Sequence, residues 1–182
     1  MNEPPGWLPG DPTPRRRVER MIRVDHAGEY GAARIYAGQL AVLGRSNKAA
    51  VLRRMQQQEQ QHLAVFSNLI AERRVRPTVL LPLWNLAGFA LGAATAALGE
   101  RTAMACTVAV EEAIDAHYAR QAAALDDDEA ELRRTIENFR AEELEHRDIA
   151  LAHEAERAPG YRLLSALIKA GCRAAIALSE RI

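Results

Sequence analysis

The chain has 182 residues, which suits one domain with a sizeable core, since single domains commonly run from roughly 100 to 200 residues. Lys plus Arg and Asp plus Glu both number 24, so the net charge is zero and nucleic acid is not expected as a partner. Cys106 and Cys172 lie far apart within apolar stretches, which indicates reduced, buried thiols in the cytosol rather than a disulfide framework or a zinc cluster.

The N-terminal residues 1–14 contain several prolines and glycines and no apolar signal core, so we predict a flexible lead rather than a targeting helix. Between residues 16 and 157 proline occurs only at Pro77 and Pro82, and Ala, Leu, Glu, Gln and Arg dominate. This mixture has high helix propensity, and the alternation typical of strands is not visible.

Turn-forming residues divide the rest of the chain into helices, which are predicted at 16–43, 47–74, 100–125, 129–157 and 161–181. Before the fourth helix, Asp128 and Glu131 fit a capping box. We therefore predict a single unit over 15–182. It consists of two helical hairpins at 16–74 and 100–157, a crossover at 75–99 and a C-terminal helix at 161–181.

The segment 77–99 contains no charged residue. About twenty apolar residues can span a bilayer, but Pro82, Asn85 and the glycines weaken that interpretation. The residues alone leave three interpretations open. The segment is a crossover helix covered by the bundle, a true span, or an interfacial element with Trp84 and Phe89 near the headgroups.

A pattern of one Glu followed about thirty residues later by Glu-x-x-His occurs twice, as Glu29 with Glu59 and His62, and as Glu111 with Glu143 and His146. Both helices of a hairpin climb about 1.5 Å per residue, so residues equidistant from the turn lie level. Glu29 and Glu59 are each fifteen residues from Gly44, and the second pair is similarly placed about Asp127. Since Glu and His at i and i+3 share a helix face, each hairpin offers two carboxylates and one imidazole to a common point.

This set of donors is the one found in ferritin-like di-iron and di-manganese bundles. We therefore predict an all-α fold, a ferritin-like four-helix bundle with an apolar crossover segment and an additional C-terminal helix. Carboxylate oxygen and imidazole nitrogen suit two divalent ions, and four buried carboxylates without metal would be strongly disfavoured. A single Glu-x-x-His favours an ordinary surface pair, but two copies with matched upstream glutamates reverse that preference.

A further repeat supports the duplication, because Glu29-x6-Tyr36-Ala37-x-Gln39 matches Glu111-x6-Tyr118-Ala119-x-Gln121. The match selects Glu111 over the adjacent Glu112 as a ligand. Glu112, Glu142 and Glu145 are interpreted as solvated residues or as supports of the ligands. Asp25, one turn before Glu29, is either a support for the imidazole of His62 or a surface residue of the helix start.

Four strings resemble the demethoxyubiquinone hydroxylase family, and the resemblance covers residues 18–182: RVDHAGEYGAARIYAGQ, AMACTVAVEEAIDAHY, FRAEELEHRDIALAHEAERAPGY and AGCRAAIALSERI. The resemblance implies two iron ions per chain, with Glu59 and Glu143 bridging, held by Glu29, Glu59, His62, Glu111, Glu143 and His146. It also implies that 77–99 meets a membrane, at the cytoplasmic face of a cell membrane if the source is bacterial.

The implied reaction is the hydroxylation of a 2-polyprenyl-3-methyl-6-methoxy-1,4-benzoquinol by dioxygen, with electrons from an external reductant. His117, Tyr118 and Arg173 are the candidates for contacting or reducing the quinone head group, with plain packing as the alternative for the first two. A lipid-binding accessory protein and a homo-oligomer remain open as partners. The main rival is an iron-handling or peroxidase protein of the ferritin or rubrerythrin kind, and the other is a salt-bridged helical scaffold without metal.

Overall fold

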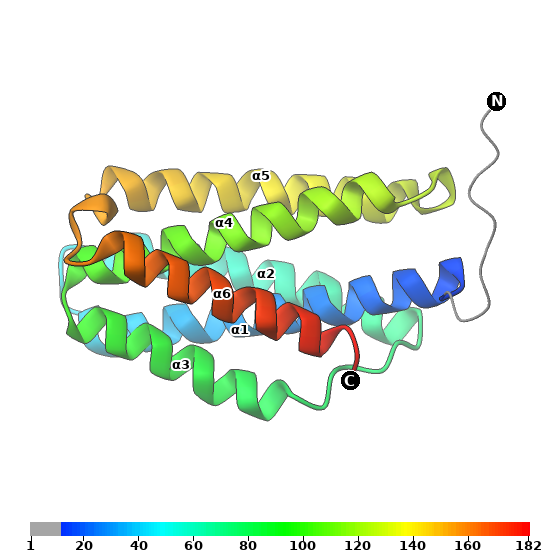
Figure 1. Cartoon of the computed structure of the whole chain (residues 1–182), viewed down its shortest axis with the longest axis horizontal. Helices are drawn as coiled ribbons and strands as arrows, with labels where there is room; N and C mark the ends of the chain where they lie inside the picture. The colour runs from blue at the N-terminus through cyan, green and yellow to red at the C-terminus, as the bar shows by residue number, and fades with distance from the viewer. Residues whose placement is uncertain (1–11) are drawn as a thin grey trace.

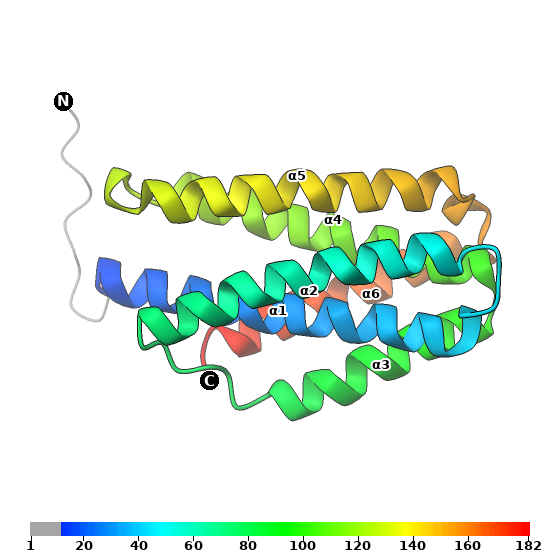
Figure 2. The same ribbon diagram turned by 180° about the vertical axis from the view of Figure 1, so that it is seen from behind.

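The computed structural model describes residues 12–182, which form α-helices and two short 3₁₀ turns without a strand. Two antiparallel hairpins make up the bundle, α1 (Pro14–Leu43) with α2 (Ala49–Glu72) and α4 (Glu100–Ala124) with α5 (Ala130–Ala152). The crossover forms α3 (Leu81–Ala97), which lies along α1, and α6 (Tyr161–Ser179) lies across α4 on the same side of the bundle (Figure 1). From behind, α2 and α5 form the opposite face (Figure 2). The predicted ferritin-like all-α class is confirmed.

Two details at the ends of the elements differ from the predictions. Helix α5 ends at Ala152, five residues before the predicted end at residue 157, because Glu154 adopts a left-handed conformation with a φ of 62°. The predicted capping box is wrong, since a 3₁₀ turn precedes α5 and the N-cap Glu129 makes no side-chain capping bond. The Glu129 carboxylate is instead paired with Arg73 at 2.6 Å. Of the predicted lead, residues 1–11 lie outside the described part of the chain.

Of the three apolar clusters in the described residues, two lie at either side of the predicted metal donors along the bundle, and the third includes Ile35, Val110 and Ile168. One of the two includes Leu52 and Met104 and lies toward one end of the bundle. The other includes Ile22, Phe66 and Ile136 and lies toward the opposite end. All five of these side chains are fully buried. Both ends of the bundle are therefore closed to water around its polar centre.

Helix α3 is held against α1 by backbone contact at glycines. A Cβ atom on Gly92 would lie 2.0 Å from the carbonyl oxygen of Ile35, and one on Gly38 would lie 2.2 Å from the carbonyl oxygen of Phe89. Atoms cannot approach so closely, so any larger residue must separate the two helices. The glycines in this segment therefore serve helix packing.

We expect Gly92→Ala to destabilise the fold by about 1–3 kcal/mol, the usual cost of forcing one extra carbon into a packed interior. Gly171→Ala on α6 is the matched control, because no atom lies within 4 Å of its added Cβ. The control is expected to be neutral or stabilising by up to about 1 kcal/mol, since alanine favours helix over glycine. Urea denaturation of both variants measures the difference, and equal midpoints would contradict the contact.

Among the helices of residues 12–182, none combines the length and apolar character that crossing a membrane requires. Large apolar side chains are nevertheless exposed on the outer surfaces of α3 and α6. Leu86 on α3 is 69 % exposed, and Leu163 and Leu167 on α6 are 68 % and 62 % exposed. These two helices thus pack on the bundle with one face only.

Candidate metal centre

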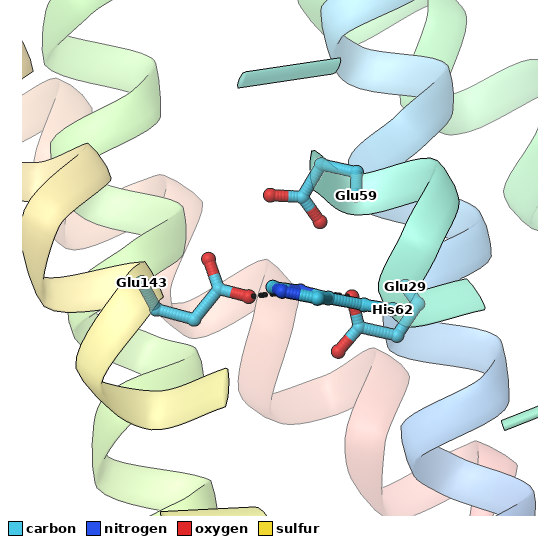
Figure 3. Close-up of side chains that lie close together, drawn as sticks. All are labelled: Glu29, Glu59, His62 and Glu143. Carbon is cyan, nitrogen blue, oxygen red and sulfur yellow. Dashed lines mark hydrogen bonds and ion pairs between the residues drawn. The ribbon is translucent and has the colours of Figure 1, made fainter. Parts of the chain in front are cut away.

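The six predicted metal donors meet at the middle of the bundle in two overlapping groups. Within each group, donor atoms from four residues lie within 4.8 Å of one another. In the first group Glu29 on α1, Glu59 and His62 on α2 and Glu143 on α5 converge from three helices (Figure 3). The second group is Glu59, Glu111, Glu143 and His146. None of the six side chains is more than 1 % exposed.

Two carboxylates, Glu59 and Glu143, belong to both groups. The His62 Nδ1 atom lies 3.1 Å from a Glu143 oxygen and 3.4 Å from a Glu29 oxygen. The His146 Nδ1 atom lies 3.1 Å from a Glu59 oxygen and 3.2 Å from the other Glu143 oxygen. Each hairpin therefore supplies three donors to one group and lends one carboxylate to the other.

The donor set fits a pair of divalent metal ions. Within the described residues, five of the donors carry a buried polar atom without a hydrogen-bond partner: Glu29 Oε2, both Glu59 oxygens, Glu111 Oε2, Glu143 Oε2 and His146 Nδ1. Buried polar atoms are nearly always partnered, so these unpartnered atoms are available to bind a metal ion. Carboxylate oxygen and imidazole nitrogen are donors that divalent first-row ions accept, and the cluster can hold metal.

Protons balance the charge of the cluster when it is metal-free. Burial raises the pKa of the Glu29, Glu59 and Glu111 carboxyls above their usual range. For His62 burial acts to lower the pKa, but the carboxylates of Glu143 and Glu29 outweigh it and raise the pKa to about 12. A cation is thus favoured at this point, and a metal ion would take the place of these protons.

The outward nitrogen of each candidate imidazole ligand has its own acceptor. His62 Nε2 lies 3.0 Å from Glu142 Oε2, and His146 Nε2 lies 3.1 Å from Gln58 Oε1. When each Nε2–H donates to its acceptor, the Nδ1 lone pair faces the carboxylates. Of the two interpretations for Glu142, the support of a candidate ligand is therefore the one that the contacts favour.

A tyrosine from each hairpin donates to a carboxylate of the other hairpin. The Tyr36 hydroxyl donates to Glu111 Oε1 at 2.7 Å, and the Tyr118 hydroxyl donates to Glu29 Oε1. Burial and the nearby carboxylates raise the pKa of both phenols well above the usual value, so both remain donors at neutral pH. Tyr36 was not among the predicted site residues, although its place in the repeat opposite Tyr118 was a signal for it.

The other predicted residues have different surroundings. His117 Nε2 lies 3.2 Å from Asp25 Oδ1, which also accepts a bond from Gln121 at 2.8 Å. Asp25 is buried and supports His117, so both interpretations of it, as a support for His62 and as a surface residue, are wrong. Arg173 is exposed on α6 and makes no hydrogen bond or ion pair within the described residues.

The neighbouring acidic residues point away from the cluster. Glu112 forms an ion pair with Lys169 on α6, and Glu145 pairs with Arg54 on α2 at 2.7 Å. The cysteines Cys106 and Cys172 are both free; Cys106 is buried as predicted, whereas Cys172 is half-buried. Burial raises the pKa of the Cys106 thiol to about 12.

An apolar groove of about 550 Å³ runs between α1, α3, α4 and α6. Its lining includes Ile35 on α1, and Gly28 on α1 and Val110 and Ile114 on α4, which lie within three residues of the candidate ligands Glu29 and Glu111. At one end the Trp84 indole N–H donates to the Ser179 hydroxyl at 3.0 Å and joins α3 to α6. The remaining lining residues are almost all apolar: Val24, Ala27, Gly31, Ala32, Ala87, Gly88, Leu91, Leu164, Leu167, Ile168, Gly171, Cys172, Ala175 and Ile176.

The fold and the donor set together define a ferritin-like bundle with a candidate carboxylate and histidine metal centre. The chain belongs to the family described as ubiquinone biosynthesis protein COQ7, whose pattern matches residues 16–179. This agrees with the resemblance found in the sequence.

Relatives from bacteria and eukaryotes are similar over most of the chain. The 3-demethoxyubiquinol 3-hydroxylase of Rhodospirillum rubrum is 60 % identical over 176 residues, which cover 96 % of this chain and 83 % of that protein. The NADPH-dependent 3-demethoxyubiquinone 3-hydroxylase, mitochondrial, of Rattus norvegicus is 60 % identical over 171 residues, covering 92 % and 79 %. The mitochondrial 5-demethoxyubiquinone hydroxylase of Saccharomyces cerevisiae is 42 % identical, covering 91 % and 78 %.

Proposed function

We propose that the chain is a di-iron monooxygenase that hydroxylates demethoxyubiquinol, a 2-polyprenyl-3-methyl-6-methoxy-1,4-benzoquinol, in ubiquinone biosynthesis. The names of relatives at 60 % identity support the reaction and the substrate class. The observation that carries the metal chemistry is the pair of donor groups that share Glu59 and Glu143. The donor groups would also suit a storage or peroxidase protein of the ferritin or rubrerythrin kind, but the relatives compared above are named as hydroxylases.

In this proposal the six donors would hold two iron ions, and Glu59 and Glu143 could serve both because they belong to both donor groups. Bound iron supplies the activation of dioxygen that hydroxylation of the ring requires. The chain holds the donors in place, because Tyr36 and Tyr118 fix the outer carboxylates through hydrogen bonds. The apolar clusters at either end of the bundle exclude water from the reacting groups.

The groove between α1, α3, α4 and α6 is the proposed binding site for the quinol ring and for the start of its polyprenyl tail. Its lining is almost entirely apolar, as an isoprenoid chain requires. Val110 and Ile114, which line it, are on the same helix as the candidate ligand Glu111 and within three residues of it, so a ring in the groove is proposed to lie near the centre. His117 and Tyr118 are proposed to hold or move protons near the ring, and Arg173 to contact the head group.

Filling the groove is expected to weaken the use of a substrate with a polyprenyl tail. Ala175→Phe puts a ring on a lining residue of α6, whereas Ala174→Phe puts the same ring on the exposed face of that helix. Losing two buried methylene groups of the tail removes roughly 1.6 kcal/mol, so KM should rise at least about tenfold for Ala175→Phe. Steady-state kinetics of both variants give the comparison, and equal KM values would place the tail elsewhere.

Peripheral membrane contact is proposed through 77–99, joined by α6, at the cytoplasmic face of a bacterial cell membrane. Helix α3 carries no charge, and α6 carries Arg162, Lys169 and Arg173 but no acidic residue. Exposed leucines on both helices flank the groove, so a lipid-borne tail can enter directly. Vesicle flotation should show binding that falls at least about tenfold when Leu86 and Leu167 are both replaced by Gln. Undiminished binding would count against this face.

The reaction is tested with iron-loaded protein, a demethoxyquinone and labelled dioxygen. Electrons are supplied by NADPH, since a relative at 60 % identity is named as NADPH-dependent, or by a chemical reductant in a second arm. The expected product has gained one oxygen atom from dioxygen by mass spectrometry. Absence of product at full iron loading with both reductants would overturn the proposed function.

A further inference from the structure

Gln58 and Glu142 occupy equivalent positions in the two halves of the bundle, each one residue before a shared carboxylate. Each reaches the histidine of the opposite hairpin, with Gln58 Oε1 3.1 Å from His146 Nε2 and Glu142 Oε2 3.0 Å from His62 Nε2. The two residues also approach each other, since Gln58 Nε2 lies 3.5 Å from Glu142 Oε2. A chain of polar contacts therefore connects both imidazoles across α2 and α5.

The two acceptors differ in charge although their positions match. A carboxylate accepting from an imidazole N–H makes a charge-assisted hydrogen bond, which is roughly twice as strong as one to a neutral amide. An anionic acceptor also makes the imidazole a stronger electron donor through Nδ1. His62 has the anionic acceptor and His146 has the neutral one.

The hydrogen bonds to the outer carboxylates are alike in the two halves. Each outer carboxylate accepts from a tyrosine, Glu29 from Tyr118 and Glu111 from Tyr36. Both groups contain three carboxylates and one imidazole. The ring contacts differ, since His62 stacks on Phe139 at 3.9 Å between centroids. The contrast between Glu142 and Gln58 is therefore the difference in charge among the hydrogen-bond partners of the two imidazoles.

We propose that Glu142 and Gln58 are positioning residues that hold His62 and His146 for metal, and that their difference in charge makes the two metal positions unequal. The ion on the His62 side is bound more tightly than the ion on the His146 side. This inference rests on the proposed di-iron function and adds to it which of the two ions is bound more tightly.

The test removes iron from the loaded protein by anaerobic titration with a ferrous chelator. The parent chain is expected to lose its two ions in two steps and to show two ferrous signals by Mössbauer spectroscopy. In Glu142→Gln the tighter step should weaken about 10- to 100-fold, the usual effect of removing the outer partner of a ligating histidine, and the steps should merge. In Gln58→Glu the weaker step should tighten instead. The double variant Gln58→Glu with Glu142→Gln should restore two steps.

Glu145→Gln is the matched control, because Glu145 also lies on α5 and is 48 % exposed but pairs with Arg54. It should behave as the parent chain does. Iron loss in one step from the parent, unchanged steps in both single variants, or no separation in the double variant would overturn the inference. A parent chain that binds no iron would instead overturn the di-iron function itself. Thermal melting confirms the fold of each variant. Gln58→Glu keeps the Glu142 side chain but replaces the Gln58 amide that contacts its carboxylate.

Discussion

Replacing Glu111 with Gln is expected to abolish hydroxylation, whereas the same change at the adjacent Glu112 is expected to leave it intact. The Glu111 carboxylate is buried, belongs to the second donor group and has one oxygen without a partner. A neutral amide at this place cannot balance a dication and is a poor ligand. The loss should exceed the 10- to 100-fold that follows removal of an outer partner, so activity should fall by at least about 100-fold.

Glu112 is a close control because it differs from Glu111 by one position on the same helix. Its carboxylate pairs with Lys169 and both side chains are about one-third exposed, so the loss should cost less than about 1 kcal/mol of stability. Iron content and turnover are measured for both variants alongside thermal melting. Retained activity in Glu111→Gln together with lost activity in Glu112→Gln would show that Glu112 supplies the ligand.

The stability of the metal-free protein is expected to fall as pH rises, and bound iron is expected to remove that fall. Burial raises the pKa of Glu29, Glu59 and Glu111, and nearby carboxylates outweigh burial to raise the pKa of His62 and His146. Above each group's usual pKa, the folded chain therefore holds more protons than the unfolded chain. Stability is lost as pH rises through that range, which begins at the ordinary pKa of 4.5 for the carboxyls and 6.5 for the imidazoles.

The pKa of Glu143 is lowered rather than raised, so its effect on stability has the opposite sign, but that effect falls in a different pH range. Burial acts to raise its pKa, yet hydrogen bonds from His146 and His62 lower it to about 2, so its contribution is already complete above pH 4.5. Bound iron displaces the protons of the other groups. For each proton displaced, the affinity of the protein for iron rises about tenfold per pH unit, over the range in which that group is protonated in the metal-free protein. The gap in Tm between loaded and metal-free protein should widen from about pH 6 to about pH 8. A gap that stays constant or narrows would contradict proton displacement.

Helix positions and the bundle were predictable because the pattern of helix formers and turn residues is local. The end of α5 was not, since nothing at Glu154 indicates its left-handed conformation. The path of the crossover depends on backbone contact between glycines of α1 and α3, which requires knowledge of the partner helix. The residues of 77–99 alone therefore left its path open among a covered crossover helix, a span and an interfacial element.

The six candidate ligands were predictable because the spacing from each turn sets their height and i, i+3 spacing sets their face. Contacts between hairpins were harder to predict, since they depend on how the two hairpins face each other. The acceptors Glu142 and Gln58 belong to this class, and so does the pairing of Asp25 with His117. The groove also depends on where α6 packs, which no motif in α6 indicates.

The exchange of one carboxylate between the hairpins has a consequence for how such a centre can arise. Neither half can complete the surroundings of an ion alone, yet a symmetric dimer of one half contains all six donors. A single chain made by duplication and fusion keeps that symmetry at the ligands and is free to lose it elsewhere. One such difference is at His117, which occupies the place in the second half of the repeat that Ile35 occupies in the first. Ile35 lines the groove. The candidate ligands are thus arranged with two-fold symmetry, whereas the groove lies on one side of the bundle.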